Sequence, residues 1–397
     1  MKVLHLTTSL SGGAGIASAR VNNALNLIGV DSTILSRNSF IDHSKLSSIQ
    51  TLFSSANTLL QSKVLQNSND LVTPLSVNII DRNANILNSA DLIHVHSYYN
   101  FLNTSLLKFL VAMRKPIFFT LHDQRLFTGG CHYSRDCNNY LRNCSQCPQV
   151  KTPFRFLVKN SFQNYESIFA DAKNIVLISP SIWLKDKAKE SKILRNIPIK
   201  VLKNPIPRIF SQYPINLNSK QDELRIAFIA AQIDNPYKGL SVFIQAVNKI
   251  ASINRAKITV VLIGKGGDVI FDPLVQIQRS TVASDEEMAK VLSEIDILVV
   301  PSSQDNSPSV IGEALCMGVT VLGSRIGGIT EILDEFRMPT FVVGEYGQLA
   351  SKILDITEFK RKEEIREKSK EYFSEESIAR KLLGFYQEAI LKCEALY

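Results

Sequence analysis

The segment Leu121–Val150 concentrates the residue types that could do chemistry in this chain. It begins with the pair His122–Asp123 and continues with four of the six cysteines, which are Cys131, Cys137, Cys144 and Cys147. The N-terminal segment carries no signal-peptide pattern, so we expect a reducing, cytoplasmic location. Clustered cysteines in such a compartment indicate metal ligands first.

The cysteine spacing predicts a structural zinc site. The four cysteines are separated by five, six and two residues, and only Cys144 and Cys147 have the tight spacing common in zinc sites. Four thiolates close the coordination sphere and leave no position for a catalytic water. His132 could replace one ligand. Free cysteines, redox-labile bridges and a catalytic metal remain as alternatives.

A second candidate site lies in residues 302–332. Asp305 and Glu313 are eight residues apart, the first in a loop and the second in a helix expected to begin near Ser307–Ser309. The free amides of a helix start favour a diphosphate, and two carboxylates can accept hydrogen bonds from hydroxyl pairs on a sugar and a ribose. An acidic cap beside a solvated glutamate would be the structural alternative, but the Gly327–Gly328 turn that follows argues against it.

Glycines also mark the turn after the first strand. Gly12, Gly13 and Gly15 open the first expected helix, where a backbone without side chains can approach a phosphate. A dinucleotide fingerprint would need glycine where Ser18 stands and an acidic residue where Arg37 ends the second strand. The sequence therefore disfavours a nicotinamide cofactor.

The elements that position these residues alternate between short apolar runs and longer amphipathic segments, which indicates two α/β domains of the Rossmann type with mostly parallel sheets. Expected strands cover residues 2–7, 32–37, 91–97, 116–123 and 174–181, and then 224–231, 257–264, 280–284, 296–303, 320–328 and 340–345. The proline-containing stretch 201–224 is the expected connection. We expect domains at 1–205 and 206–375, followed by a helix at 376–397 that packs toward the first domain.

Charge distinguishes the two halves of the 397-residue chain. The net charge of +8 divides into +12 over residues 1–203 (23 basic, 11 acidic) and −4 over residues 204–397 (22 basic, 26 acidic). A basic first half suggests an anionic partner. Residues 151–170 interleave lysine and arginine with phenylalanine, which fits either a helix with one buried face or a helix on an anionic membrane surface.

Residues 301–333, with the Asp305–Glu313 spacing and the Gly327–Gly328 turn, resemble the family 4 retaining glycosyltransferases, and the similarity extends over nearly the whole chain. The resemblance implies the GT-B fold, with an interdomain cleft. It also implies transfer of a hexose from a nucleoside diphosphate sugar to a glycan or a polyisoprenyl-diphosphate-linked acceptor. No metal or other cofactor would be required for transfer. The cysteine-rich insertion 131–147 resembles one in a subset that builds polysaccharides and lipid-linked glycans.

The resemblance also implies roles for individual residues. Glu313 would hold the donor ribose, Asp305 the transferred sugar, and Lys238 the diphosphate. His122, Gly12 and Gly13 would lie in the active site near the donor. The helix start would add donor contacts from Asn306, Ser307 and Ser309.

Two departures from the family pattern concern the donor: Asp305 stands where glutamate is usual, and Gln232 where many members carry arginine. We further expect at most one of His94 and His96 to point into the site. The competing functions are a nucleotide-sugar epimerase of the same fold and a nucleic-acid-binding protein. The second is disfavoured because the charge forms no single stripe and no nucleic-acid module is recognisable.

Overall fold

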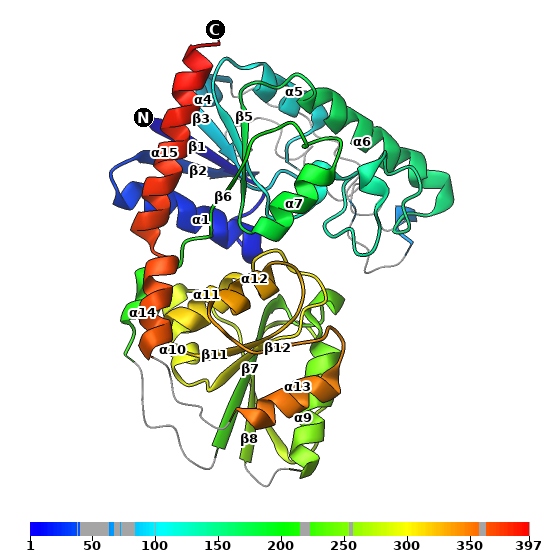
Figure 1. Cartoon of the computed structure of the whole chain (residues 1–397), viewed down its shortest axis with the longest axis vertical. Helices are drawn as coiled ribbons and strands as arrows, with labels where there is room; N and C mark the ends of the chain where they lie inside the picture. Colours follow the sequence, from blue (N-terminus) through cyan, green and yellow to red (C-terminus); the bar gives the residue numbers. More distant parts are fainter. Residues whose placement is uncertain are drawn as a thin grey trace. The chain divides into compact units, whose positions relative to one another are not determined.

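The computed structural model describes residues 1–37, 39, 63–66, 72, 84–99, 101–214, 223–253, 257–356 and 363–396. The chain divides into two compact units (Figure 1). Unit 1 comprises Met1–Lys203 together with Ile378–Tyr397, and unit 2 comprises Asn204–Ser377. Each unit is built on a sheet of six parallel strands, which confirms the predicted fold class of two Rossmann-like α/β folds.

The sheet of unit 1 has the order β2-β1-β3-β4-β5-β6. Its strands are β1 (Lys2–Thr7), β2 (Asp31–Ser36), β3 (Leu92–Val95), β4 (Ile117–Thr120), β5 (Ile175–Ser179) and β6 (Ile199–Val201). The central strands β3 and β4 are buried along their whole length. Parallel strands with both faces covered are expected to be continuous apolar runs, as "IFFT" in β4 illustrates.

Helices cover both faces of this sheet. The helices of unit 1 are α1 (Gly12–Leu27), α4 (Ala84–Ser89), α5 (Thr104–Ala112), α6 (Arg155–Phe169), α7 (Ile182–Glu190) and most of α15 (Glu375–Glu394). Buried side chains of α5, α6 and α7 join one hydrophobic core, whereas those of α1 and α15 join another with β1, β3, β4 and β5. Figure 1 shows α15 (red) on the α1 side of the sheet. The C-terminal helix thus buries its apolar stripe, including Tyr386, against unit 1.

The sheet of unit 2 has the order β12-β11-β10-β7-β8-β9. Its strands are β7 (Glu223–Gln232), β8 (Lys257–Lys265), β9 (Val275–Ser280), β10 (Ile297–Val300), β11 (Thr320–Ser324) and β12 (Thr340–Phe341). Its helices are α8 (Arg208–Gln212), α9 (Leu240–Ile253), α10 (Asp285–Ser293), α11 (Ser309–Cys316), α12 (Gly327–Glu335), α13 (Tyr346–Asp355) and α14 (Glu363–Tyr372). Buried residues of α9 and α13 share one core, and those of α10, α11 and α12 share the other.

Three sequence predictions about elements need correction. The strand predicted at residues 280–284 is wrong, because the strand is Val275–Ser280 and Ser284 caps α10 by accepting a hydrogen bond from the amide of Glu287. Strand β6 was not predicted. The connection 201–224 contains helix α8, whose Phe210 is fully buried, while residues 215–222 of that connection lie outside the described residues. No helix in the described ranges combines the length and the apolar run needed to cross a bilayer.

Gly384 offers a stabilising substitution within α15. It lies in the interior of this helix, and a methyl group added there would meet no atom within 4 Å. Alanine in a helix interior is favoured over glycine by about 1 kcal/mol. We therefore expect Gly384→Ala to raise the free energy of unfolding by about 0.5–1 kcal/mol, measured by urea denaturation. An unchanged or lower denaturation midpoint would contradict this packing.

Candidate active site

In unit 2, an ion pair joins the turn after β7 to the loop after β10. The ammonium of Lys238 lies 2.6 Å from Oδ2 of Asp305, and the side chains are 30% and 9% exposed. Lys238 ends a short 3₁₀ turn, Pro236–Lys238, in which the side chain of Asn235 accepts a hydrogen bond from the amide of Tyr237. The pair lies at the carboxyl end of the parallel strands, where ligands bind in open α/β sheets.

Gly239 explains how Lys238 reaches this position. Its φ of +76° belongs to the left-handed region, and a Cβ at this residue would lie 2.0 Å from the carbonyl oxygen of Pro301. The turn therefore rests directly on the backbone that leaves β10. A hydrogen bond of 2.8 Å from the amide of Ser303 to the carbonyl of Tyr237 ties the two segments together.

Two helix starts meet at Asp305. Helix α11 begins at Ser309 behind Pro308, which has no side chain that can cap the first amides. The amide of Gly328, in the first turn of α12, donates to the carbonyl of Asp305 over 3.3 Å. Uncapped amides at a helix start carry partial positive charge and attract anions. The turn after β7 and the loop after β10 thus bring together a lysine, a carboxylate and two helix N-termini.

The other predicted donor residues of unit 2 lie along the same loop and helix. Asn306 is buried, and Ser307 and Ser309 are half-buried at the start of α11. Glu313 lies one turn further into this helix and is only 6% exposed. An ionised carboxylate accepts hydrogen bonds and donates none, and Glu313 presents one close to the start of α11.

In unit 1, the predicted glycines lie at the start of α1. Gly12 has a φ of +74°, and a Cβ at either Gly12 or Gly13 would meet no atom within 4 Å. The crowded position is Gly15, where a Cβ would lie 2.5 Å from the carbonyl oxygen of Ser9. The absence of a side chain at Gly15 lets the loop after β1 fold onto the helix that Gly12 begins.

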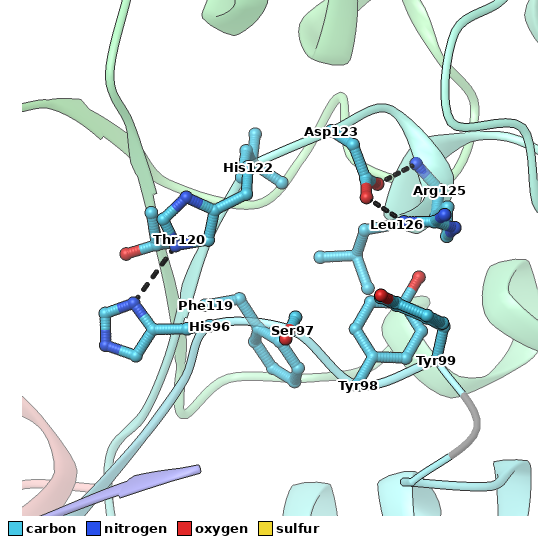
Figure 2. Close-up of a pocket in the computed structure, with 11 residues that line it drawn as sticks. His96, Ser97, Tyr98, Tyr99, Phe119, Thr120, His122, Asp123, Arg125 and Leu126 are labelled. Carbon is cyan, nitrogen blue, oxygen red and sulfur yellow. Dashed lines mark hydrogen bonds and ion pairs between the residues drawn. The ribbon is translucent and has the colours of Figure 1, made fainter. Parts of the chain in front are cut away.

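His122 follows β4 and belongs to a chain of hydrogen-bonded imidazoles. Its Nε2 lies 3.1 Å from Nδ1 of His96, a contact that a dashed line marks in Figure 2. Nε2 of His96 lies 2.8 Å from Nδ1 of His5. His5 and His96 are buried, and His122 is half-buried beside a small pocket. The sequence analysis did not assign His5 to this site.

Of His94 and His96, the second is among the residues that line this pocket and the first is not. Residues two apart in a strand point to the same face of the sheet, and these two rings stack with centroids 4.3 Å apart and planes 24° apart. They differ in their partners instead. His94 bonds to the hydroxyls of Tyr386 (2.5 Å) and Thr120 (2.8 Å), whereas His96 bonds to the other histidines.

The ligand atoms of His5, His94 and His96 lie within 4.8 Å of one another, close enough to consider a shared metal ion. The rings lie within 34° of parallel, however, with centroids 4.3–5.1 Å apart. Imidazole lone pairs lie in the ring plane, and stacked planes do not converge on one ion. Both nitrogens of His94 are also engaged by hydroxyls. The arrangement fits hydrogen bonding better than metal ligation.

Burial keeps these imidazoles neutral. It lowers the pKa of His5 to about 3 and that of His122 to about 4, although the nearby Asp123 acts to raise the latter. Burial also lowers the pKa of His94 and of His96 well below the usual 6.5, with neighbouring histidines adding to the effect. His122 therefore enters any reaction near neutral pH as an uncharged ring.

These pKa values predict acid lability. As the pH falls below about 6.5, histidines protonate in the unfolded chain but not in the folded one, so the free energy of unfolding falls by about 1.4 kcal/mol per pH unit for each. We expect a lower urea midpoint at about pH 5 than at about pH 7.5. His96→Asn should flatten this dependence. Equal midpoints at both pH values in the unchanged protein would contradict neutral burial.

Asp123 and Arg125 line the same pocket (Figure 2). The guanidinium of Arg125 pairs with the carboxylate of Asp123 and lies 4.3 Å from the ring centroid of Tyr99. The amide of Arg125 also donates to Oδ1 of Asp123 over 2.8 Å. Arg125 thus fixes the position of the Asp123 side chain in the wall of the pocket.

The cysteine-rich segment forms an irregular loop with a small buried centre. Cys131, Cys144 and Cys147 are buried, and Gln149 and Asn139 approach the sulfurs of Cys131 (3.5 Å) and Cys137 (3.3 Å). Within the described part of the chain, no three of the cysteine sulfurs lie within 4.8 Å of one another. Four sulfurs at about 2.3 Å from one zinc ion would all do so. The cysteine sulfurs are therefore too far apart in this structure to bind one zinc ion together. Structural zinc stays a prediction from the sequence.

Helix α6 carries most of the aromatic and basic side chains of residues 151–170. Val158, Phe162, Ile168 and Phe169 are buried, and Phe154 and Leu157 pack partly against the same core. Phe156, at 56% exposure, is the large apolar side chain that α6 leaves in solvent. The apolar face of this helix is thus largely used by unit 1 itself.

The comparisons with known proteins agree with this architecture. Residues 223–358 match the family model described as Glycosyl transferases group 1. No curated protein sequence matches the chain. Solved structures with the same fold include sucrose-phosphate synthase from Thermosynechococcus elongatus (15% identity, 98% of this chain and 99% of that chain, TM-score 0.63).

Two further structures cover almost the whole chain. One is a glycosyltransferase from Rickettsia africae (15% identity, 98% of both chains, TM-score 0.60). The other is HepE from Anabaena, solved with UDP and with UDP-glucose (14% identity, 98% of this chain and 100% of that chain, TM-score 0.58). At these identities the likeness shows the GT-B fold, and the match to the glycosyl transferase family model lies within unit 2.

Proposed function

We propose that this protein is a retaining glycosyltransferase that moves a hexose from a nucleoside diphosphate sugar to a glycan or lipid-linked glycan acceptor. The observation that carries the proposal is the Lys238–Asp305 ion pair at the starts of α11 and α12. A cation and two helix N-termini suit a diphosphate, and the adjoining carboxylates suit sugar and ribose hydroxyls.

The donor contacts follow from the chemistry of each group. Lys238 and the first amides of α11, with Ser307 and Ser309, bind the diphosphate. Glu313 accepts hydrogen bonds from the ribose hydroxyls, and Asp305 with Asn306 contacts the hexose. UDP is the nucleotide we favour, because HepE, which shares the fold, is solved with UDP and with UDP-glucose. Gly12 and Gly13 of unit 1 leave room for a phosphate beside the backbone.

Many members of the resembling family carry an arginine at the position of Gln232, and Lys265 is a candidate to supply the missing positive charge. The two residues are register partners on β8 and β7, and the amide of Ile233 donates to the carbonyl of Lys265 over 2.9 Å. Lys265 is exposed at the carboxyl end of its strand. We propose that its ammonium adds to the positive field at the diphosphate.

The reaction we propose is a front-face substitution. The acceptor hydroxyl forms the new bond to the anomeric carbon on the face that the diphosphate leaves, and its proton passes to the departing phosphate oxygen. Lys238 stabilises the charge that develops on the leaving group. Asp305 forms an ion pair with Lys238, and we assign its carboxylate to binding of sugar hydroxyls and not to nucleophilic attack on the anomeric carbon. His122 contributes a neutral imidazole near the sugar.

The acceptor is proposed to be recognised by the basic unit 1. Lys151 and Lys159 are exposed near Phe156, a combination suited to an anionic membrane surface at which a polyisoprenyl-diphosphate-linked glycan resides. Flotation with vesicles containing anionic lipid measures this contact. A protein that stays unbound at low salt would leave a water-soluble glycan as the acceptor class.

Product analysis tests the whole proposal. Binding of a panel of nucleoside diphosphate sugars is measured by thermal shift, and the product made with the best donor is analysed by NMR. We expect the anomeric configuration of the donor in the product and nucleotide release that requires an acceptor. Conversion of the donor sugar without any acceptor would indicate an epimerase instead. A product of inverted configuration would exclude the retaining mechanism.

A further inference from the structure

Which ring nitrogen of each histidine carries the proton can be worked out from one end of the hydrogen-bonded chain, His5, where Nε2 has no partner among the described residues. Each ring is neutral and carries one N–H, so each contact in the chain has one donor and one acceptor. Nε2 of His5 is buried and has no hydrogen-bond partner among the described residues. A proton on that nitrogen would be a buried N–H without an acceptor, which native structures rarely tolerate. The proton of His5 therefore belongs on Nδ1.

The remaining protons follow in sequence. Nδ1–H of His5 donates to Nε2 of His96 over 2.8 Å, so the proton of His96 must lie on its Nδ1. Nδ1–H of His96 then donates to Nε2 of His122 over 3.1 Å. His122 is left with its own proton on Nδ1. His94 does not alter this order, because its nitrogens bond to Tyr386 and Thr120.

We propose that His5 and His96 are positioning residues that hold His122 in the Nδ1–H tautomer, so that His122 acts as a hydrogen-bond donor toward the sugar. The role assigned to this donor rests on the proposed glycosyl transfer. The partner of Nδ1–H must present an oxygen lone pair, such as that of a sugar hydroxyl. The opposite order would leave His122 with an acceptor nitrogen instead, and it would function as a base.

Nitrogen NMR of the unchanged protein reads the tautomer directly. In ¹⁵N-histidine-labelled protein, long-range ¹H–¹⁵N spectra distinguish protonated from unprotonated ring nitrogens, and loss of one ring's signals in His122→Gln assigns His122. We expect the protonated shift at Nδ1 and the unprotonated shift at Nε2 of His122, near neutral pH and without ligand. The reverse pattern would overturn the proposal without any reference to activity.

Two substitutions at His96 separate positioning from packing. In His96→Asn the amide nitrogen takes the place of Nδ1 and can still donate to His122, whereas His96→Leu keeps the bulk and removes the donor. We expect His96→Leu to lower kcat/KM by about 10- to 100-fold, as loss of an orienting partner typically does, and His96→Asn to keep most of the activity. His94→Leu, on the same strand but outside the chain, controls for removal of a buried imidazole and should leave the His122 tautomer unchanged.

The outcomes are distinguishable. Equal losses in His96→Asn and His96→Leu with an unchanged His122 tautomer would overturn the positioning role. A protein with the expected tautomer that transfers no sugar from any donor would instead refute the proposed function and leave the order of the histidine chain intact.

Discussion

Lys238→Ala should reduce sugar transfer by about 100- to 1,000-fold while the protein still folds and unit 2 remains intact. The ammonium of Lys238 is proposed to stabilise the negative charge that builds on the diphosphate as the sugar leaves. Because that charge is greatest in the transition state, the loss should appear in kcat more than in KM. The measurement is steady-state release of the nucleoside diphosphate in the presence of the acceptor.

The substitution also leaves Asp305 without its partner, and that effect must be separated from the chemical one. Asp305 is 9% exposed, so an unpaired carboxylate there costs stability. The double variant Lys238→Ala with Asp305→Asn should recover stability but not activity. Lys368→Ala is the matched control, because Lys368 forms a surface ion pair of 2.7 Å with Glu335 in the same unit. It should leave kcat unchanged, and near-normal turnover in well-folded Lys238→Ala would refute the role of Lys238.

Apolar runs made most of the strands predictable, and β9 shows where that signal ends. Buried strands such as "ILVV" in β10 are visible because both faces are covered. Strand β9, "VQIQRS", is an edge strand whose residues after Val275 are exposed, so it has no apolar run, and the prediction was displaced to residues 280–284. Edge strands are selected by pairing with a neighbour, here β8, which local sequence does not reveal.

In the candidate site, too, some features are visible in the local sequence and others depend on long-range pairing. Asp305, Glu313 and Lys238 were proposed from spacing and a family resemblance, and the structure places Lys238 in contact with Asp305 across 67 residues of sequence. The chain from His5 to His96 spans 91 residues and arises because β1 and β3 are neighbours in the sheet. Histidines at these positions look like ordinary strand residues until that pairing is known. Their hydrogen bonds are long-range consequences of topology.

The second large effect is expected from Gly239→Ala, which changes no charged or hydrogen-bonding side chain. Alanine would have to adopt a φ of +76° with its Cβ 2.0 Å from the carbonyl oxygen of Pro301, so the turn must lift away from the end of β10. Left-handed strain and this contact together should cost at least about 3 kcal/mol of stability. That corresponds to a melting temperature lower by roughly 6–12 °C.

Activity should fall in Gly239→Ala for a reason separate from stability. Lys238 immediately precedes the glycine, and movement of the turn carries its ammonium away from Asp305 and from the diphosphate site. A displacement of about 1 Å at a catalytic group can cost about 100-fold in rate. The assay is therefore run well below the melting temperature, where the variant is folded, with Gly384→Ala as the control at an uncrowded glycine. Wild-type turnover and melting temperature in Gly239→Ala would mean that the turn does not rest on Pro301, and the geometry that positions Lys238 would have to be revised.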